Sequence, residues 1–489
     1  MKRGRDLKKY NVIYIVVIMI MIISFVLFGN YKKNVASSID NRYLAEFPQK
    51  ISNSFTKELT DYTQDRIGFR DSMISLYTNF NNKVFQIFPN NIYGKHGNLF
   101  GNGEAYLASY QHLNGDDEYA EYFAEYIKKL QNFCEAREID FVYMLNPDKT
   151  TTYPEEMPES IGVYSAENLT EQIKRHLINK NVRSVFVDEV FKEVKSKELL
   201  FYKVYDPSHW SDYGRIVGVN SVLEELSLNE LSLKEDFERK EVLAVKQQTS
   251  AVVINDSLIG YKSKYLYDKQ DIKGLETLDL VNPDAFGVFK NCNSQSNKKP
   301  KLLLLCDSYL LNNFDYFGDN FSEIVGVHAY DLPKIQMLIS LFEPDIVIFE
   351  NVERAMDAFY PKDLIKAYGD VFLPDYSTFS NLPEKKEKAE ISISYVNGIE
   401  VQNECKGDVN RKIWSIEGMA LDNSLSPGAA IYASVGKKIY LPVQYMNGQF
   451  KFIIDLNALK DEEEIQFLLI DDLRTAKYKT SFFDVILDE

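Results

Sequence analysis

A short apolar run between polar neighbours is the clearest pattern in the middle of the chain. In residues 301–311, KLLLLCDSYLL, four leucines are followed at once by Cys306, Asp307 and Ser308. A run this short, stopped by small polar residues, predicts a buried parallel strand. Because open α/β sheets place their reactive groups at the carboxyl ends of the strands, we expect Ser308 at that edge.

Helix-like and strand-like stretches alternate on both sides of this run. The apolar spacing is helical at 116–135, from 167 onward, at 211–226 and at 332–341, and it is strand-like at 139–145, 184–187, 322–327 and 344–350. This alternation predicts an α/β fold, a flavodoxin-like parallel sheet with flanking helices. A helix pair over 55–88 is expected to lie on this domain. Residues 229–299 fit the pattern less well, and we interpret them as an excursion from the sheet that ends in an exposed loop.

The period changes to two from residue 391 onward. The segments ISISYV, AAIYASV, KIYLPV and KFIID are separated by Gly, Asn and Pro turns, which predicts an all-β sandwich over 389–489. A charged run at 384–388 is interpreted as a linker, and it leaves 32–383 for the α/β domain. Either the aromatic side chains of the sandwich stack on a bound carbohydrate or they fill its core; the candidates are Trp414, Tyr432, Tyr440 and Tyr445.

The first residues predict a membrane anchor. No charged residue lies between 10 and 31, whereas five basic residues precede this stretch. A span of this length and charge asymmetry predicts a transmembrane helix over 10–31, with residues 1–9 in the cytoplasm and the rest of the chain outside the cell. A cleaved signal peptide is the alternative, but the apolar stretch is long for one and no clear cleavage site follows it.

Composition excludes several classes of protein. The chain has 489 residues, 45% of them hydrophobic, which is ample for folded domains. With 56 basic against 72 acidic residues and a net charge of −16, it is not expected to bind nucleic acid, which requires clustered Lys and Arg. Four widely spaced cysteines make neither a zinc ribbon nor a disulfide framework.

A second polar loop supplies partners for the serine. In residues 205–213, YDPSHWSDY, Asp206 stands three positions before His209. A serine hydroxyl becomes a nucleophile when an imidazole accepts its proton and a carboxylate orients the imidazole. Taken alone, Ser308 is as well explained as a helix cap and His209 as a structural loop residue. We nevertheless predict that Ser308, His209 and Asp206 form a catalytic triad, because both loops belong to the edge where such sheets expose reactive groups.

These residues resemble the SGNH hydrolases, in which one block carries the serine and a DxxH block carries the acid and the base. Here the DxxH block comes first, so the chain is similar to the circularly permuted members of the alginate O-acetyltransferase type, AlgJ and AlgX, and to the DHHW-like proteins. Further segments agree in order: DNRYLAEFP, DRIGFRD, GKHGNLF, NPDKTTTYPEEMP, PSHW and PDIVIFENVER. The resemblance covers residues 40–360.

The resemblance implies a function and its partners. Such proteins are anchored or exported and O-acetylate extracellular polysaccharides, commonly beside a multipass membrane acyltransferase that supplies the acetyl groups. It implies no cofactor and no metal. It also makes Asn351 the candidate side-chain donor of an oxyanion hole, with the backbone N–H of Ser308 as its companion, and makes Arg354 a candidate contact for an acetyl or sugar group.

The chain departs from the family pattern in two places. Cys306 replaces the glycine of the serine block, and Asp206 stands three residues before His209 where DHHW-like proteins often have two. Two other functions stay open. One is an esterase that uses the same triad with water as acceptor, and the other is a non-catalytic scaffold that binds polysaccharide within a membrane assembly.

Overall fold

A computed structural model of the protein describes the chain in segments, and within some helices and strands it describes the backbone alone. The described residues are 2–33, 35, 37, 43–51, 54–81, 84, 91–246, 253–270, 278, 280–292, 298–356, 360–363, 365, 381–401, 411–421, 430–436, 438–446, 448–455, 465–470 and 477–480.

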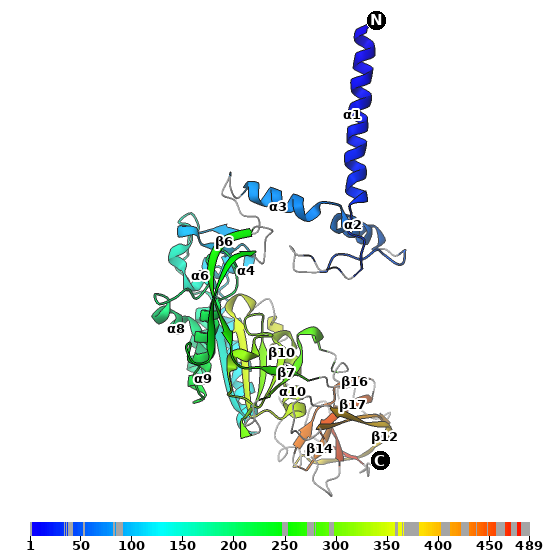
Figure 1. Ribbon diagram of the computed structural model, residues 1–489. Helices are drawn as coiled ribbons and strands as arrows, with labels where there is room; N and C mark the ends of the chain where they lie inside the picture. Colours follow the sequence, from blue (N-terminus) through cyan, green and yellow to red (C-terminus); the bar gives the residue numbers. More distant parts are fainter. Residues whose placement is uncertain are drawn as a thin grey trace.

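A seven-stranded sheet forms the centre of the fold (Figure 1), in the order β4-β3-β11-β9-β10-β8-β7. Its first five strands run parallel, while β8 pairs antiparallel with β10 and β7 antiparallel with β8. The sheet is therefore mixed, and the prediction of a parallel sheet is correct only for its larger part. The strands are β3 (Asp140–Asn146), β4 (Ser184–Phe186), β7 (Tyr267–Lys269), β8 (Gly287–Asn291), β9 (Lys301–Cys306), β10 (Glu323–His328) and β11 (Ile346–Val352).

Alternating side chains of each central strand face two separate cores. In β9, Leu303 and Leu305 belong to one core, while Leu302, Leu304 and Cys306 belong to the other. Helices cover both faces of the sheet, as a buried strand with apolar residues on both sides requires. On the first face lie α5 (Asp117–Glu135), α7 (Leu169–Asn179) and α10 (Ile335–Phe342), and on the second lie α8 (Val187–Val194) and α9 (Asp212–Glu225). The predicted α/β fold with flanking helices is confirmed.

A long hairpin stands apart from this sheet. Strands β5 (Phe237–Lys246) and β6 (Val253–Ser263) pair with each other as a separate two-stranded sheet and extend beyond the edge of the domain (Figure 1), and β6 contacts α9. Together with β7 and β8 it occupies the stretch that the sequence pattern did not place. Two further strands, β1 (Asn91–Tyr93) and β2 (Leu99–Gly101), form a small antiparallel pair.

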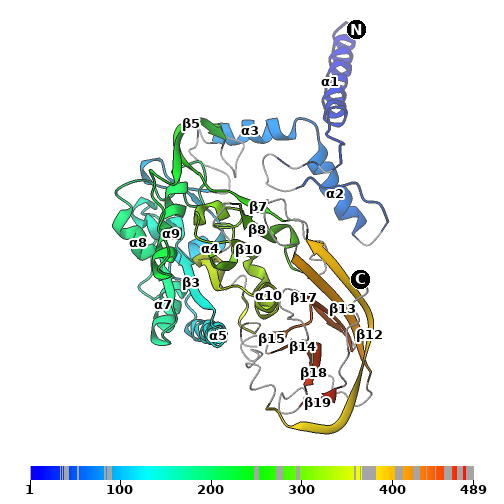
Figure 2. The same cartoon turned by 60° about the horizontal axis from the view of Figure 1, so that its bottom comes forward.

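The C-terminal part of the chain is all β, as predicted. Its eight strands follow the order β15-β14-β18-β19-β12-β13-β17-β16, and the long, bent β12 runs along their outer side (Figure 2). The predicted linker at 384–388 is wrong, because Glu384 already pairs with Lys477 of β19 as β12 begins. The strands are β12 (Glu384–Val401), β13 (Arg411–Leu421), β14 (Ala430–Val435), β15 (Lys438–Tyr440), β16 (Gln444–Met446), β17 (Gln449–Asp455), β18 (Ile465–Ile470) and β19 (Lys477–Thr480).

Two of the four aromatic candidates in this part are buried, Tyr440 in the core of the β strands and Tyr432 in a core shared with the α/β domain. Tyr432 and Tyr440 are buried, and the hydroxyl of Tyr440 donates to Glu343 of the α/β domain at 3.0 Å. Neither ring is available to stack on a sugar. The side chains of Trp414 and Tyr445 lie outside the described residues.

The N-terminal helix is present, but the structure does not support its predicted role. Helix α1 (Lys2–Leu27) projects away from the body of the protein (Figure 1), and α2 (Phe55–Arg66) and α3 (Arg70–Phe80) follow it. Within the described part of the chain, no helix combines the length and the apolar character that a membrane crossing requires.

Candidate active site

The loop that precedes α9 is held in one conformation by Asp206. Its Oδ1 atom accepts hydrogen bonds from the backbone N–H groups of Ser208 and His209, at 2.9 and 3.0 Å. Just beyond, the Ser211 hydroxyl caps α9 by accepting from the N–H of Gly214 at 3.1 Å. An Asp that bonds the backbone two and three residues ahead favours a tight turn, so the same side chain that faces the imidazole also shapes its loop.

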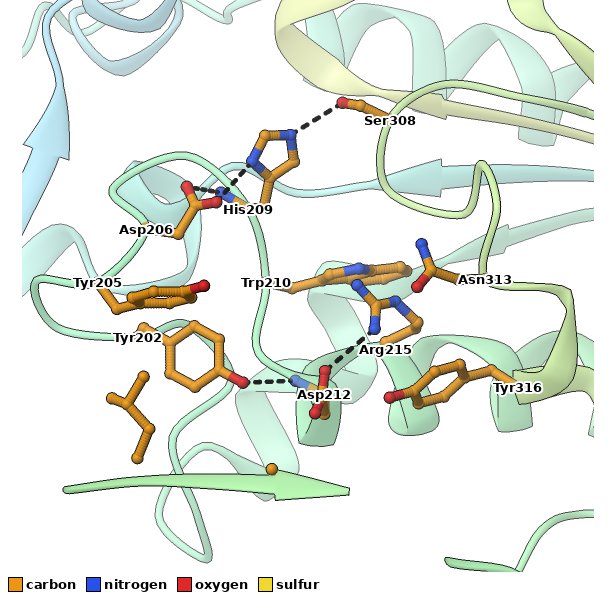
Figure 3. Close-up of a pocket in the computed structure, with 12 residues that line it drawn as sticks. Tyr202, Tyr205, Asp206, His209, Trp210, Asp212, Arg215, Ser308, Asn313 and Tyr316 are labelled. Atoms are coloured by element: carbon orange, nitrogen blue, oxygen red, sulfur yellow. Dashed lines mark hydrogen bonds and ion pairs between the residues drawn. The ribbon is translucent and has the colours of Figure 1, made fainter. Parts of the chain in front are cut away.

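Ser308, His209 and Asp206 form one hydrogen-bonded chain (Figure 3). The Oγ atom of Ser308 lies 2.9 Å from Nε2 of His209, and Nδ1 of His209 lies 3.0 Å from Oδ2 of Asp206. Asp206 is 3% exposed, the His209 side chain is 33% exposed and Ser308 faces solvent. Two loops that are 99 positions apart in the sequence thus meet in the order that nucleophilic catalysis by serine requires.

The carboxylate of Asp206 is kept ionised by its neighbours. Burial alone raises the pKa of this carboxyl group, but the hydrogen bond to His209 and the backbone N–H groups of Ser208 and His209 outweigh burial, so its pKa is lowered. An ionised carboxylate at this position favours the tautomer of His209 that carries its proton on Nδ1 and leaves Nε2 free to accept from Ser308.

Two buried acidic side chains, Asp307 and Glu350, hold the turn after β9 in place. Asp307 accepts from the backbone N–H of Tyr309 at 2.9 Å and from that of Val352 at 2.7 Å, while its own N–H donates to Glu350 at 2.8 Å. Burial raises the pKa of Glu350 well above its ordinary value. Asp307 therefore ties β9 to β11 and leaves Ser308 as the residue that faces outward.

The neighbouring Cys306 does not compete with this serine. It is a free cysteine at the end of β9 and is completely buried. Burial raises the pKa of its thiol well above the ordinary value, so the reactive thiolate is disfavoured. The cysteine that replaces the family's glycine is a core residue here.

Arg354 contacts residues that support the site, and its guanidinium does not line the pocket. Its guanidinium forms an ion pair with the buried Asp148 and donates to the hydroxyl of Tyr309 at 3.2 Å. That hydroxyl in turn donates to the backbone carbonyl of Ser208 at 2.8 Å, and the Tyr309 ring lies 5.6 Å from the imidazole of His209. The arrangement does not favour the predicted contact of Arg354 with an acetyl or sugar group.

Asn351 does not reach the serine either. It is completely buried in β11, and its amide Nδ2 donates to the hydroxyl of Tyr360 at 3.0 Å. The order of the family motifs along the chain correctly places Asn351 on a strand next to β9. Its amide, however, is buried and points into the core. The structure therefore gives the side chain no position from which to donate to an oxyanion.

Sequence reasoning missed a buried lysine that shapes the loop before Asp206. The ammonium of Lys149 donates to the backbone carbonyls of Leu99, Tyr202 and Lys203 at 2.8, 2.8 and 2.9 Å. Burial lowers the pKa of Lys149 to about 7. Its position in the polar stretch that follows β3, at the same carboxyl edge as Ser308, is the signal that could have identified it.

A pocket of about 590 Å³ lies against the three predicted residues, with β6 on its opposite side (Figure 3). Its lining is rich in aromatic rings and includes Leu258 and Gly260 of the β5–β6 hairpin. Besides the three predicted residues, the lining side chains that define its shape and charge are Tyr202, Tyr205, Trp210, Asp212, Arg215 and Tyr316. In the described residues, no cluster of three or more His, Cys, Asp and Glu side chains is arranged to hold a metal ion.

The cysteines differ in state. Cys134 and Cys306 are free and buried, whereas Cys292, just after β8, is disulfide-bonded. Cys405 lies outside the described residues. The sequence pattern, which implied no disulfide framework, gave no sign of this bond because a single disulfide has no characteristic spacing.

The sequence around the imidazole loop is similar to a known family. Residues 92–260 match the family described as SGNH hydrolase-like domain, acetyltransferase AlgX. The match covers less than half of the chain. It contains Asp206 and His209 but ends before Ser308, so the proximity of the serine to this domain's histidine rests on the coordinates. No curated protein matches the chain in sequence.

Several solved structures show a partial similarity to the chain at low identity. Bacillus cereus PatB1 with a sulfonyl adduct is 14% identical, with a TM-score of 0.41 over 53% of this chain and 95% of its own. The O-acetyltransferase domain of Pseudomonas putida AlgJ is 15% identical, with a TM-score of 0.37 over 58% of this chain and 99% of its own. Pseudomonas aeruginosa AlgX is 12% identical, with a TM-score of 0.34 over 82% and 94%. Similarities of this size assign neither an activity nor a substrate to this chain.

Proposed function

We propose that the protein is an O-acetyltransferase that carries an acetyl group on Ser308 and transfers it to a hydroxyl of a polysaccharide. One observation carries the proposal: the 2.9 Å approach of Ser308 Oγ to His209 Nε2, with Asp206 on the opposite ring nitrogen, in a chain whose imidazole loop lies in a stretch that matches an AlgX-type domain. The predicted roles of Ser308 as nucleophile, His209 as base and Asp206 as its orienting acid are part of this proposal.

The reaction has two steps in this proposal. His209 Nε2 takes the proton of Ser308 as Oγ attacks the acetyl carbonyl, and it returns that proton to the leaving group of the donor. A sugar hydroxyl then attacks the acetyl-serine ester, gives its proton to His209, and Ser308 leaves as the alcohol when His209 protonates its Oγ atom. The backbone N–H of Ser308 is the candidate donor to the carbonyl oxygen in both steps.

Replacing Ser308 with Ala tests the proposal. Mass spectrometry of the wild-type protein after brief incubation with para-nitrophenyl acetate should find one added acetyl group on the peptide that contains Ser308. The Ser308→Ala protein should form no such adduct and should leave polysaccharide acetylation in cells at the level of a deletion strain. Normal acetylation in cells with Ser308→Ala would favour the non-catalytic scaffold.

Exposure of the site supports an esterase as the second candidate. Ser308 faces solvent and one third of the His209 side chain is exposed, so the structure as it stands does not exclude water from an acetyl-serine. The ratio of acetate to acetylated saccharide, measured with and without an oligosaccharide, separates the two functions. An unchanged acetate yield on adding saccharide would favour the esterase.

We also propose that the protein acts outside the cell, at the membrane, with a multipass acyltransferase as its acetyl source. The basic residues before residue 10 and the uncharged stretch after them support this topology at the level of sequence. The disulfide-bonded Cys292 is consistent with an oxidising compartment. Protease treatment of intact cells, followed by detection of an N-terminal and a C-terminal tag, tests the location; survival of the C-terminal tag would contradict it.

A further inference from the structure

The one cationic side chain in the lining of the pocket is already engaged by other groups of the protein. Arg215 is the only Lys or Arg among the residues that line the pocket. Its guanidinium bonds Asp212 at 3.1 Å, lies 4.7 Å from the centre of the Tyr316 ring, and the side chain is 13% exposed. A guanidinium whose charge is neutralised by Asp212 and that is largely covered attracts a carboxylate of a ligand less strongly than an unpaired one.

Two largely buried cations behind the site are engaged by other groups as well. Arg354 is paired with buried Asp148, and Lys149 directs its ammonium to three backbone carbonyls. Neither residue lines the pocket. The remaining charged groups of the lining are the carboxylates Asp206 and Asp212, and the chain as a whole carries a net charge of −16. A polyanion approaching this site would meet like charge at short and at long range.

The rest of the lining suits an uncharged sugar. Tyr202 and Tyr205 meet edge to face, 5.4 Å between ring centres, and stand on the same side of the pocket (Figure 3). Aromatic rings contact the apolar C–H faces of sugars, while a tyrosine hydroxyl and a carboxylate can bond sugar hydroxyls, which both donate and accept. Leu258 and Gly260 close the pocket with a second apolar surface.

From this charge pairing and lining we infer that the acceptor is an uncharged, hydroxyl-rich polysaccharide and not a polymer of uronic acids. This inference rests on the proposed acetyl transfer at Ser308. It assigns Tyr205 the role of a binding residue for the acceptor.

Binding is tested first, independently of catalysis, with the Ser308→Ala protein. The probes are a neutral glucan oligosaccharide and the same oligosaccharide with its primary alcohols oxidised to carboxylates. We expect the neutral probe to bind at least about tenfold more tightly by calorimetry, with the same affinity at about 50 and about 500 mM NaCl. Tighter binding of the oxidised probe, weakened by salt, would overturn the inference.

Transfer is tested next with the wild-type protein and para-nitrophenyl acetate. If acetyl-serine forms and the neutral probe speeds its turnover more than the oxidised probe does, the inference holds. If acetyl-serine forms and the oxidised probe is the better acceptor, or neither probe has an effect, the inference fails while the acetyl-enzyme stands. If no acetyl-serine forms, the proposed function itself fails.

Variants of Tyr205 locate the binding surface. Tyr205→Ala should weaken binding of the neutral probe by roughly tenfold, the value of one aromatic contact, while Tyr205→Phe should keep most of the affinity. Tyr164→Ala, at an exposed tyrosine that does not line the pocket, is the matched control. Equal affinity in Tyr205→Ala and the control would remove Tyr205 from the site.

Discussion

Replacing Asp206 with Asn isolates the electrostatic role of the carboxylate. The two side chains have the same shape, and Oδ1 of Asp206 already accepts two backbone N–H groups, from Ser208 and His209. In the variant the amide oxygen should keep that place, because only an oxygen can accept those bonds. The amide NH₂ then faces Nδ1 of His209, 3.0 Å away in the native site.

This exchange forces His209 into the wrong tautomer. Nδ1 must accept from the new NH₂ group, so the ring proton moves to Nε2 and points at Ser308 Oγ, where a lone pair is needed. In serine enzymes this substitution lowers the rate by roughly ten-thousandfold. We expect a loss of roughly a thousand- to ten-thousandfold in acetylation of Ser308, or about 4 to 5.5 kcal/mol in the activation free energy.

Stopped-flow release of para-nitrophenol measures the acetylation step. Since both backbone hydrogen bonds survive, the thermal midpoint of Asp206→Asn should stay close to that of the wild type. Asp284→Asn, at an exposed carboxylate, provides the control for a change of one charge. Acetylation within about tenfold of the wild-type rate in a folded Asp206→Asn protein would refute the assigned role of the carboxylate, since a lost tautomer costs far more.

Three further outcomes follow from buried groups. Lys149→Met removes the ammonium that donates to three backbone carbonyls; at roughly 1 kcal/mol for each hydrogen bond lost, urea denaturation should show a loss of about 3 kcal/mol in the free energy of unfolding, and an unchanged midpoint would contradict this. Burial raises the pKa of Glu353 to about 8 from 4.5, so between these pH values the folded protein holds a proton that the unfolded chain has released, and stability falls as the pH rises. Glu353→Gln cannot ionise and should lack this fall, which amounts to roughly 3–5 kcal/mol by pH 8; parallel stability curves for the two proteins from pH 5 to 8 would disprove the assignment. Denatured without reductant, the protein should bind maleimide at Cys134 and Cys306 but not at Cys292, which should become reactive after reduction; labelling of Cys292 before reduction would contradict its disulfide.

Periodicity is sufficient to find the strands and helices of the central sheet. The leucine run of β9 and the apolar spacing of α5 were both interpreted correctly, because a buried strand and an amphipathic helix each leave a regular hydrophobic pattern in the sequence. The antiparallel strands β7 and β8 leave a weaker trace. They are short and their pairing is long-range, so nothing local in residues 229–299 reveals that they extend the sheet.

Some residues of the site could be predicted from the sequence, and others could not. Sheet topology predicts the position of Ser308, because this residue directly follows β9 at the carboxyl edge. The loop with His209 follows α8 and not a strand, so its meeting with Ser308 is known only from the coordinates. The failure at Asn351 has a different cause, because the direction of a side chain at a strand end depends on the register with its neighbours. The supporting roles of Lys149 and Asp148 could not be predicted. A sequence does not show which polar side chains of a loop turn inward, to bond backbone carbonyls as Lys149 does or to pair with another side chain as Asp148 does.

The hairpin of β5 and β6 forms one wall of the pocket and belongs to a sheet of its own. It forms its own two-stranded ladder, and its Leu258 and Gly260 complete the pocket while the chemistry is carried by loops of the central sheet. It is joined to the site by hydrogen bonds from the N–H of Tyr261 to Asp212, at 2.9 Å, and from the hydroxyl of Tyr316 to the carbonyl of Tyr261, at 2.7 Å. Transplanting the hairpin between homologous proteins would therefore be a direct way to exchange one sugar preference for another while leaving the reaction centre in place.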